Sequence, residues 1–349
     1  MAGMATVGRS AARPVATVLP TRTGVRVSVV IPTYNRSASL QRLLRALGNS
    51  AVPAGGMEVV VVDDGSTDAT THVAAQAEVH CLTQPNYGPA AARERGWRSS
   101  TGEIVVFLDD DVVPEPEAIV RMVEALDEAD GVGAAIMPLN PDPLIAHYMH
   151  VDGLVDHNVR DGEVRWLITA AAAFKRSALE RVGGFDLTFP RAAGEDVDLT
   201  LRLIEAGFRL RLETSAIVRH DHRSRFRQLL GTCYRYGTAY KLLASRHMAH
   251  RAQRLRNALL RLSPLEWRRL YLGYRRDASI ARSVAFLALH VLVVAPYAFG
   301  VIRGEGTRRG KHLISDVDLA ADENGIELTG TAQRPALALV SAEEGAPAA

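Results

Sequence analysis

The chain has 349 residues, of which 47% are hydrophobic and 23% are charged, and its formal net charge is +2. These values exclude a disordered or collagen-like protein, and the length allows one large domain with an appendage or two ordinary domains. The two cysteines, Cys81 and Cys233, lack metal-ligand spacing and do not suggest a disulfide framework. We therefore expect a globular protein of a reducing cytosol.

Charge is distributed unevenly along the chain. Residues 209–311 contain about 22 Lys and Arg residues against about 5 Asp and Glu residues, whereas the acidic residues concentrate before residue 198. Such a basic segment suits nucleic acid, an anionic membrane surface or solvent. Its aromatic residues follow no stacking pattern, so we expect no nucleic-acid partner.

Strands and helices alternate in the first part of the chain. Apolar, mostly β-branched runs predict buried strands at residues 25–31, 59–62, 79–82 and 104–108. One-faced or alanine-rich runs predict helices that begin at Ser37 as an N-cap, at 69–77, at 88–98 and from Pro114 onward. This order predicts βαβ units and an open α/β sheet, mostly parallel and flanked by helices.

The middle of the chain gives weaker signals. Residues 133–137 and 164–168 are expected as strands, and the Pro, Asp and His-rich stretch between them as a loop. A helix is predicted to open at residues 194–198, and residues 210–218 are predicted to form an edge strand.

Three polar segments, 32–36, 63–68 and 109–111, each follow a predicted strand. Ligands of open α/β sheets lie outside the carboxyl ends of the strands, so these segments are expected to share one edge. The consecutive carboxylates of Asp109, Asp110 and Asp111 predict a hard cation, Mn²⁺ or Mg²⁺. The alternative for an isolated triplet is a solvated turn that caps the next helix, and the coincidence of three motifs favours the ligand site.

Four motifs in the chain resemble those of inverting family 2 glycosyltransferases of the GT-A fold. They are Val29-Val30-Ile31-Pro32-Thr33-Tyr34-Asn35-Arg36, Val61-Val62-Asp63-Asp64-Gly65-Ser66-Thr67-Asp68, Phe107-Leu108-Asp109-Asp110-Asp111 and Gly194-Glu195-Asp196. The segment 86–93 is also similar to a glycine-containing segment of that family. The resemblance covers residues 25–222 and implies a GT-A (Rossmann-like) mixed sheet that binds a nucleoside diphosphate sugar of the UDP or GDP type.

The resemblance implies a nucleotide site that begins at Pro32. Tyr34 would pack on the base, and Asp63 would accept a hydrogen bond from it. The alternative for Tyr34 is an ordinary turn residue. For Asp63 and Asp64 the alternative is an Asx turn that holds the following backbone.

The resemblance assigns the diphosphate region to Asp109 for the ribose and Asp111 for the metal, with Asp110 able to share either role. The metal would neutralise the charge of the nucleoside diphosphate as it leaves. Arg93 would add positive charge near the pyrophosphate or base, although an Arg on a helix is more often a solvated surface residue. His220 would complete the metal shell, with His222 as its competitor.

The pair Glu195 and Asp196 resembles the acidic pair of the family's acceptor site. Asp196 is therefore predicted as the general base that takes the proton of the acceptor hydroxyl during an inverting attack. The alternative, a helix N-cap, is compatible with this role because it would keep the carboxylate ionised.

Residues 223–311 are expected to form a basic helical extension, between a disordered leader at 1–24 and a mobile tail at 312–349. Within the extension, residues 283–302 contain no Asp, Glu, Lys or Arg, and about 20 residues at about 1.5 Å each can span a bilayer. Arginines flank this run on both sides and Pro296 interrupts it, which favours a monotopic or re-entrant helix on a membrane over a simple span. The alternative is a buried core helix.

Together these features predict a metal-dependent, inverting glycosyltransferase, peripheral on the cytoplasmic face of the membrane, with a glycan or lipid-linked acceptor. One rival is a nucleotidyltransferase that makes a nucleotide sugar, but residues 32–36 lack the Gly-rich, basic loop of such enzymes. The other is a non-catalytic sugar-nucleotide-binding module, which Asp196 beside a full metal motif disfavours.

Overall fold

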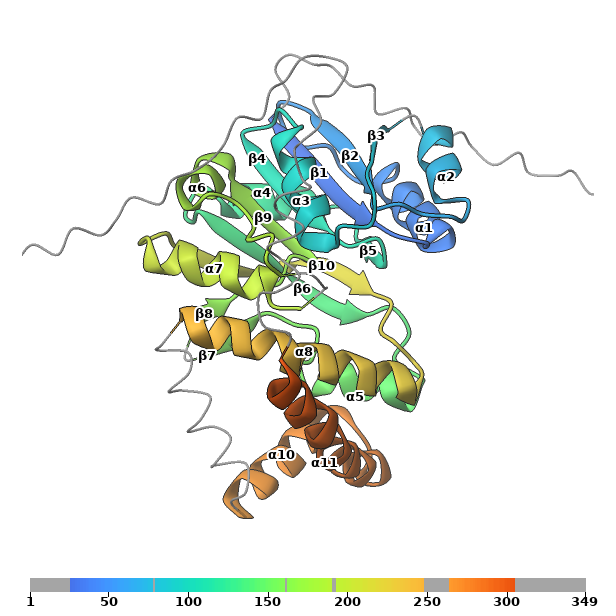
Figure 1. Ribbon diagram of the computed structural model, residues 1–349, viewed down its shortest axis with the longest axis vertical. Helices are drawn as coiled ribbons and strands as arrows, with labels where there is room; N and C mark the ends of the chain where they lie inside the picture. The colour runs from blue at the N-terminus through green and yellow to red at the C-terminus, as the bar shows by residue number, and fades with distance from the viewer. Residues whose placement is uncertain (1–25, 78, 161, 190–192, 248–263, 305–349) are drawn as a thin grey trace, which may run out of the picture.

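The protein is described by a computed structural model over residues 26–77, 79–160, 162–189, 193–247 and 264–304 (Figure 1). Its strands are β1 (Val27–Thr33), β2 (Met57–Asp63), β3 (His80–Thr83), β4 (Ile104–Leu108), β5 (Val112–Pro114), β6 (Gly131–Pro138), β7 (Asn158–Arg160), β8 (Glu163–Trp166), β9 (Ala171–Lys175) and β10 (Leu210–His220). Its helices are α1 (Ser37–Leu47), α2 (Thr70–Gln76), α3 (Pro89–Arg98), α4 (Ala118–Ala125), α5 (Leu144–Val151), α6 (Arg176–Val182), α7 (Glu195–Glu205), α8 (Phe226–Arg246), α10 (Pro264–Asp277) and α11 (Ile280–Arg303).

An eight-stranded sheet of order β3-β2-β1-β4-β9-β6-β10-β5 forms the centre of the molecule, and β7 pairs with β8 beside it. β1 runs parallel to β2 and β4, and β2 runs parallel to β3. β9 is antiparallel to both β4 and β6, and the short β5 is antiparallel to β10. The predicted mixed, mostly parallel sheet flanked by helices is confirmed.

Alternate side chains of β1 enter two different cores because successive residues of a strand point to opposite faces of a sheet. Val29 and Ile31 pack with the leucines of α1 and with α4, whereas Val30 packs with Trp97 of α3 and with side chains of α6 and α7. All three valine and isoleucine side chains are fully buried. The two helical layers therefore hold the carboxyl ends of β1, β2 and β4 at one fixed edge.

Several local predictions were wrong. Ser37 is the first residue of α1, and the N-cap is Arg36, whose side chain makes no capping hydrogen bond to the helix. Pro114 ends β5 and begins no helix, because residues 112–114 pair with the end of β10. That pairing also makes β5 the last strand of the sheet in place of β10.

The helical extension packs as a group at one end of the molecule (Figure 1). Side chains of α5, α8, α10 and α11 share one apolar core that includes Tyr148, Leu229, Tyr274 and Phe286. α8 and α11 approach closely, since a Cβ added at Gly237 would lie 2.1 Å from the carbonyl oxygen of Tyr297. The predicted leader at 1–24 and tail at 312–349 lie outside the described residues.

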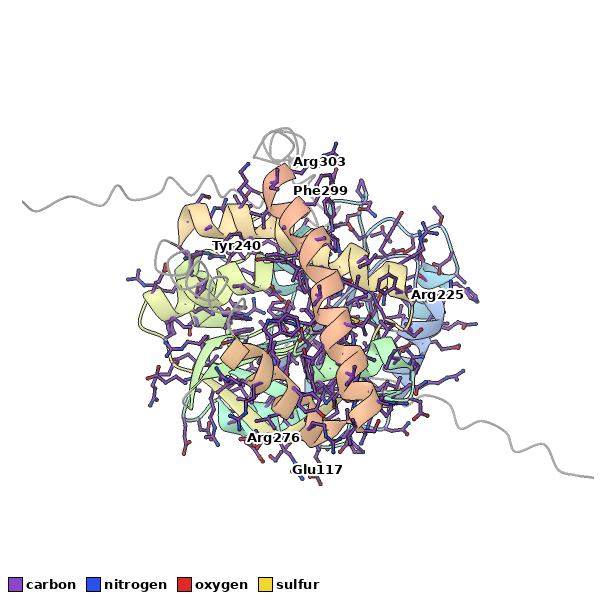
Figure 2. All side chains as sticks on the ribbon, turned by 90° about the horizontal axis from the view of Figure 1, so that it is seen from below. Glu117, Arg225, Tyr240, Arg276, Phe299 and Arg303 are labelled. Carbon is purple, nitrogen blue, oxygen red and sulfur yellow. The ribbon has the colours of Figure 1, made fainter. Side chains whose placement is uncertain are left out.

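Helix α11 contains the whole predicted apolar run (Figure 2). By length and composition it is the single helix in the described ranges that could cross a membrane, with a hydropathy of 2.2 and 28% of its most apolar window buried. Apart from Arg303 at its end, its exposed large side chains are apolar; they are Ile280, Val284, Val291, Leu292, Val294, Phe299 and Ile302.

Candidate active site

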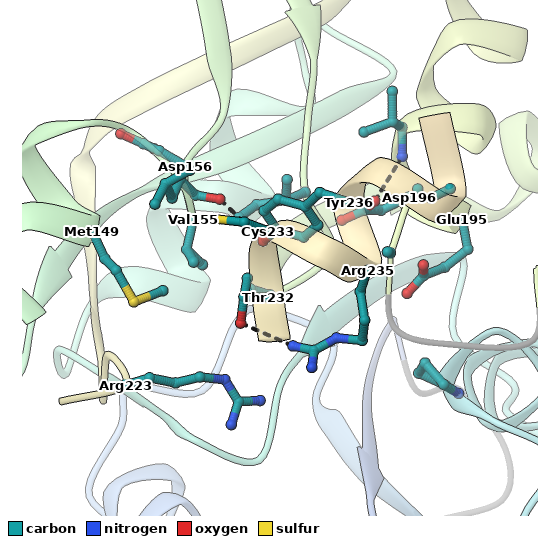
Figure 3. A pocket seen from close by; sticks show the side chains of 18 of the residues that line it. Met149, Val155, Asp156, Glu195, Asp196, Arg223, Thr232, Cys233, Arg235 and Tyr236 are labelled. Atoms are coloured by element: carbon teal, nitrogen blue, oxygen red, sulfur yellow. Dashed lines mark hydrogen bonds between the residues drawn. The ribbon is translucent and has the colours of Figure 1, made fainter. Parts of the chain in front are cut away.

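A cavity of about 1500 Å³ lies between the sheet edge and the helical extension. Its lining includes every predicted site residue except Asp63, namely Pro32, Tyr34, Arg93, Asp109, Asp110, Asp111, Glu195, Asp196 and His220. The opposite wall comes from α5, α8 and α11, and Figure 3 shows Arg235 and Tyr236 of α8 beside Glu195 and Asp196. The topology has therefore brought motifs far apart in sequence to one place.

The first two motifs meet because β1 and β2 are parallel neighbours in register. Thr33, the last residue of β1, pairs with Asp63, the last residue of β2. Asn35 has a positive φ of 52°, and its side-chain oxygen accepts a hydrogen bond from the backbone nitrogen of Thr67 at 2.7 Å. The loop after β1 is thus tied to the loop after β2, and Tyr34 between them is 46% exposed at the cavity.

Asp63 and Asp64 both serve their own loop. Asp63 Oδ1 accepts from the backbone nitrogen of Ser66 at 2.9 Å, and its Oδ2 accepts from Thr71 Oγ1 at 2.6 Å. Asp64 accepts from Gln84 Nε2 and from the backbone nitrogens of residues 87 and 88 at 2.8 to 2.9 Å. Asp64 lines the cavity although the sequence assigned it only to a possible Asx turn, and the base contact of Asp63 stays a prediction.

The three carboxylates after β4 have side-chain partners instead. Thr33 Oγ1 donates to Asp110 Oδ2 at 2.8 Å, and Arg36 Nη1 lies 3.4 Å from Asp110 Oδ1 and also contacts Asp111 Oδ2. Burial and the charge of Asp111 raise the pKa of Asp110 to about 7. Burial acts to raise the pKa of Asp111 too, but His220 and Arg36 outweigh it and lower that pKa. Negative charge therefore concentrates on Asp111.

Arg93 joins the third motif to the fourth. Its Nη2 donates to Asp109 Oδ1 at 2.6 Å and its Nη1 donates to Glu195 Oε1 at 2.9 Å. Burial acts to lower the pKa of Arg93, but the charges of Asp109 and Glu195 outweigh it and raise that pKa. Arg93 is a buried member of the site, so its reading as a solvated surface residue is wrong.

The start of α7 presents the acidic pair to the cavity. Gly194 has a φ of +87°, a left-handed conformation that glycine adopts without strain, and it is the N-cap of the helix. Asp196 is the second helical residue and not the N-cap. Burial raises the pKa of Asp196 against the opposing charge of Arg93, and burial with the charge of Asp196 raises that of Glu195 to about 7. A carboxylate of raised pKa is a stronger base than an ordinary aspartate.

The residues near Asp111 fit a divalent cation that also binds a diphosphate. His220 Nε2 lies 3.4 Å from Asp111 Oδ1, and His220 Nδ1 is buried without a hydrogen-bond partner. Across the described ranges no three His, Cys, Asp or Glu side chains converge on one metal position. Mg²⁺ is commonly held by one or two protein groups together with phosphate oxygens and water, so a set of two ligands suits this chemistry.

His222 lies beside His220 but is less well placed. The two rings are 4.7 Å apart, and His222 is buried with no partner on either ring nitrogen among the described residues. Burial and the charge of His220 lower the pKa of His222 to about 3. His222 is not among the residues that line the cavity, in contrast to His220.

Comparison with known proteins agrees with this geometry. Residues 28–183 match the model of glycosyl transferase family 2. The chain is 36% identical over 236 residues to a pre-mycofactocin glycosyltransferase of Mycobacterium tuberculosis (strain CDC 1551 / Oshkosh), which covers 63% of this chain and 48% of the relative. It is 40% identical over 117 residues to an undecaprenyl-phosphate 4-deoxy-4-formamido-L-arabinose transferase of Klebsiella pneumoniae (strain 342), which covers 31% of this chain and 36% of the relative.

The chain thus spans about half the length, or less, of these curated relatives. Among solved structures, a mannosyltransferase from Pyrobaculum calidifontis in complex with GDP-Man and Mn²⁺ has a TM-score of 0.50 and 21% identity, and the match covers 85% of this chain and 88% of that one. This structural likeness supports the fold. Residues 28–183, whose motifs gather at one sheet edge, are therefore similar to glycosyl transferase family 2, and the chain has the GT-A fold.

Proposed function

We propose that the protein is a metal-dependent, inverting glycosyltransferase that moves a sugar from a nucleoside diphosphate sugar to an acceptor hydroxyl. One observation carries this proposal: the carboxylates after β4 and the acidic pair at the start of α7 face the same cavity. The first group suits a metal-bound diphosphate and the second suits a hydroxyl that must lose a proton. A transferase needs both chemistries side by side.

The donor half of the cavity has a group for each part of a nucleotide. Tyr34, exposed at the sheet edge beside Pro32, offers an aromatic face to a base, and Asp109 offers an acceptor to the ribose hydroxyls. Asp111 and His220 would hold Mn²⁺ or Mg²⁺, which would offset the charge on the departing diphosphate. Asp110, whose pKa is raised, is the less suited ligand because it binds its proton more tightly.

The acceptor half supplies the base. In the proposed step, an acceptor oxygen forms a bond to the anomeric carbon while the bond from that carbon to the diphosphate oxygen breaks. The proton of the acceptor hydroxyl passes to the carboxylate of Asp196, and the leaving group departs as the nucleoside diphosphate. Attack from the face opposite the diphosphate inverts the anomeric configuration. Glu195 would help to hold the acceptor side in place.

The extension suits an acceptor at the cytoplasmic face of a membrane. The exposed face of α11 is apolar, while Arg275 and Arg276 lie in the last turn of the neighbouring α10 and Arg303 ends α11. An apolar face bordered by arginines favours an anionic lipid surface. The match to a transferase named for undecaprenyl-phosphate is consistent with a lipid-linked acceptor, and a glycan acceptor is the alternative.

Donor turnover tests the proposal. Purified protein is incubated with a panel of UDP and GDP sugars and Mn²⁺ or Mg²⁺, and nucleoside diphosphate release is measured with a chelator control. We expect turnover that Asp196→Asn lowers by about 10²- to 10⁴-fold. Asp127→Asn, at an exposed carboxylate outside the cavity lining, is the matched control. Unchanged turnover in Asp196→Asn would remove that residue as the base.

Other products would point to other functions. Release of pyrophosphate from a nucleoside triphosphate would favour a nucleotidyltransferase. Nucleotide binding without turnover of any donor would favour a non-catalytic module.

Vesicle flotation tests the membrane surface. The exposed Val284 and Leu292 of α11 lie outside the cavity lining, so replacing both with Glu alters the apolar face alone. We expect this double variant to lose binding to vesicles of anionic phospholipid. The control is Val52→Glu, at an equally exposed valine of the sheet domain. Equal flotation of the double variant and wild type would contradict membrane docking through α11.

A further inference from the structure

The guanidinium of Arg93 lies between the donor and acceptor halves of the cavity, and its contacts are unusual for a nucleotide-binding arginine. The side chain is 5% exposed, and each of its two terminal nitrogens donates to a protein carboxylate. One carboxylate, Asp109, follows β4, and the other, Glu195, opens α7, which is 102 positions away from Arg93 in the chain. The fork of one arginine thus spans the two motifs that the reaction must bring together.

We infer, resting on the proposed function, that Arg93 is a positioning residue that couples Asp109 of the donor site to Glu195 of the acceptor site. In this role it acts through the two carboxylates and does not hold the diphosphate directly. Arginine suits the task because its planar fork can bind two carboxylates at fixed angles, whereas a lysine is a single point charge.

The contacts of Arg93 with Asp109 and Glu195, called the Arg93 bridge below, are made by a buried side chain. Burial explains why this bridge would fix the positions of the two carboxylates. Arg93 and Glu195 are almost inaccessible to solvent, and Glu195 Oε2 has no hydrogen-bond partner among the described residues. With one oxygen unpaired, the orientation of Glu195 depends on the contact of its Oε1 with Arg93. Breaking one side of a buried ion pair leaves an uncompensated charge, so the pair strongly favours one arrangement.

The bridge would also position the base. Asp196 follows Glu195 in the first turn of α7, so a shift of Glu195 moves Asp196 with it. Misplacement of a reacting group by about 1 Å can lower a rate about 100-fold without weakening ground-state binding. Loss of the bridge should therefore act on kcat more than on nucleotide affinity.

Two variants break the bridge from opposite ends. Arg93→Lys keeps the positive charge but removes the fork, and Glu195→Gln keeps a hydrogen-bond acceptor but removes the negative charge. Arg98→Lys is the matched control, because Arg98 lies on the same helix α3, is exposed and forms an ion pair with Glu94, outside the cavity lining. Thermal melting establishes that each variant is folded, and Glu195→Gln decides the question if Arg93→Lys does not fold.

The decisive measurement compares turnover with nucleotide affinity. For both bridge variants we expect kcat to fall by about 10- to 100-fold, while the Kd for UDP or GDP with Mg²⁺, measured by calorimetry, stays within about twofold.

The possible results separate the inference from the function on which it rests. Active wild type with a nucleotide Kd at least about tenfold weaker in Arg93→Lys would show a direct diphosphate contact and overturn the inference alone. An unchanged kcat in both variants would also overturn it. Wild type that turns over no donor would refute the proposed function and the inference together.

Discussion

Two acidic segments follow neighbouring parts of the same sheet, yet their carboxylates have different kinds of partner. Asp63 and Asp64, after β2, accept hydrogen bonds from backbone nitrogens, hydroxyls and an amide of their own and adjacent loops. Asp109 and Asp111, after β4, face the guanidinium groups of arginines. Identical residue types at corresponding strand ends therefore serve different purposes.

The kind of partner distinguishes the two purposes. A hydrogen bond from a backbone nitrogen to an Asp side chain can form only while the loop keeps its conformation. The side chains of Asp63 and Asp64 therefore stabilise that loop conformation. The Arg36 side chain is 31% exposed, so its guanidinium can move and a metal ion can replace it at Asp111, whereas Arg93 is buried and keeps its contact with Asp109. We therefore assign loop stability chiefly to the pair after β2 and catalysis chiefly to the triplet after β4, and the predictions below test that division.

The largest expected effect is on turnover in Asp111→Asn. The substitution removes the negative charge that would hold the metal, while it preserves the side-chain shape. We expect turnover to fall by about 10²- to 10⁴-fold, with a much smaller change in melting temperature. Initial rates at saturating donor and Mn²⁺, compared with Asp127→Asn, test this. Wild-type rates in Asp111→Asn would contradict the assignment of catalysis to the carboxylates after β4.

Asp64→Asn should show the opposite behaviour. Asp64 Oδ1 accepts from Gln84 Nε2 and the nitrogen of Tyr87, and Oδ2 accepts from the nitrogen of Gly88. An amide has one acceptor oxygen, so its NH₂ group must face at least one N–H donor. We expect the free energy of unfolding to fall by about 1–3 kcal/mol. Urea denaturation measures it, and equal stability with lost turnover would reverse the assignment of Asp64.

The positions of these motifs followed from the sequence because parallel strands share their carboxyl edge. The apolar strands 59–62 and 104–108 were recognisable by local composition, and each ended in acidic residues. Local composition did not reveal the hydrogen-bond and ion-pair partners of each carboxylate. Arg36 contacts Asp110 from 74 positions away in sequence, and Arg93 reaches Asp109 from α3, so both contacts depend on the assembled fold.

Segments with misleading local composition were the hardest to predict. Residues 144–151 looked like part of a Pro, Asp and His-rich loop, but they form α5, whose Tyr148 packs with Phe286 of α11. β9 begins with three alanines, which have low strand propensity, yet it is a central strand between β4 and β6 in which those alanines are fully buried. The cavity wall from α8, including Arg235 and Tyr236, depends on the same long-range packing.

Arg36→Gln tests whether the arginine partner of Asp110 and Asp111 can be displaced by a metal ion. Arg36 occupies oxygens of Asp110 and Asp111 that a divalent cation would use, so it competes with the cation. We expect the affinity for Mn²⁺ without nucleotide to rise about two- to fivefold, the range of a partly exposed ion pair. Calorimetric titration measures it. Arg42→Gln is the control, since Arg42 pairs with Asp221 at 2.8 Å and lies outside the cavity lining. Weaker Mn²⁺ binding in Arg36→Gln would mean that Arg36 supports the metal.

The smallest expected effect, in Asp110→Asn, depends on pH. Burial and the charge of Asp111 raise the pKa of Asp110 from 3.8 to about 7 in the folded state, so the folded protein binds this proton more tightly than the unfolded chain. The contribution of Asp110 to wild-type stability therefore declines as pH rises from about 4 to about 7. Asparagine does not titrate, and its oxygen can still accept the hydrogen bond of Thr33.

Without that titration, the melting temperature of Asp110→Asn should match wild type near pH 4 and exceed it by about 2–4 °C at pH 8. Differential scanning calorimetry at both pH values, without divalent cations, measures the difference. The same substitution at Asp64 should lower the melting temperature at pH 8, because its carboxylate accepts three hydrogen bonds. If both variants were destabilised alike, the carboxylates after β4 would support their loop as those after β2 do.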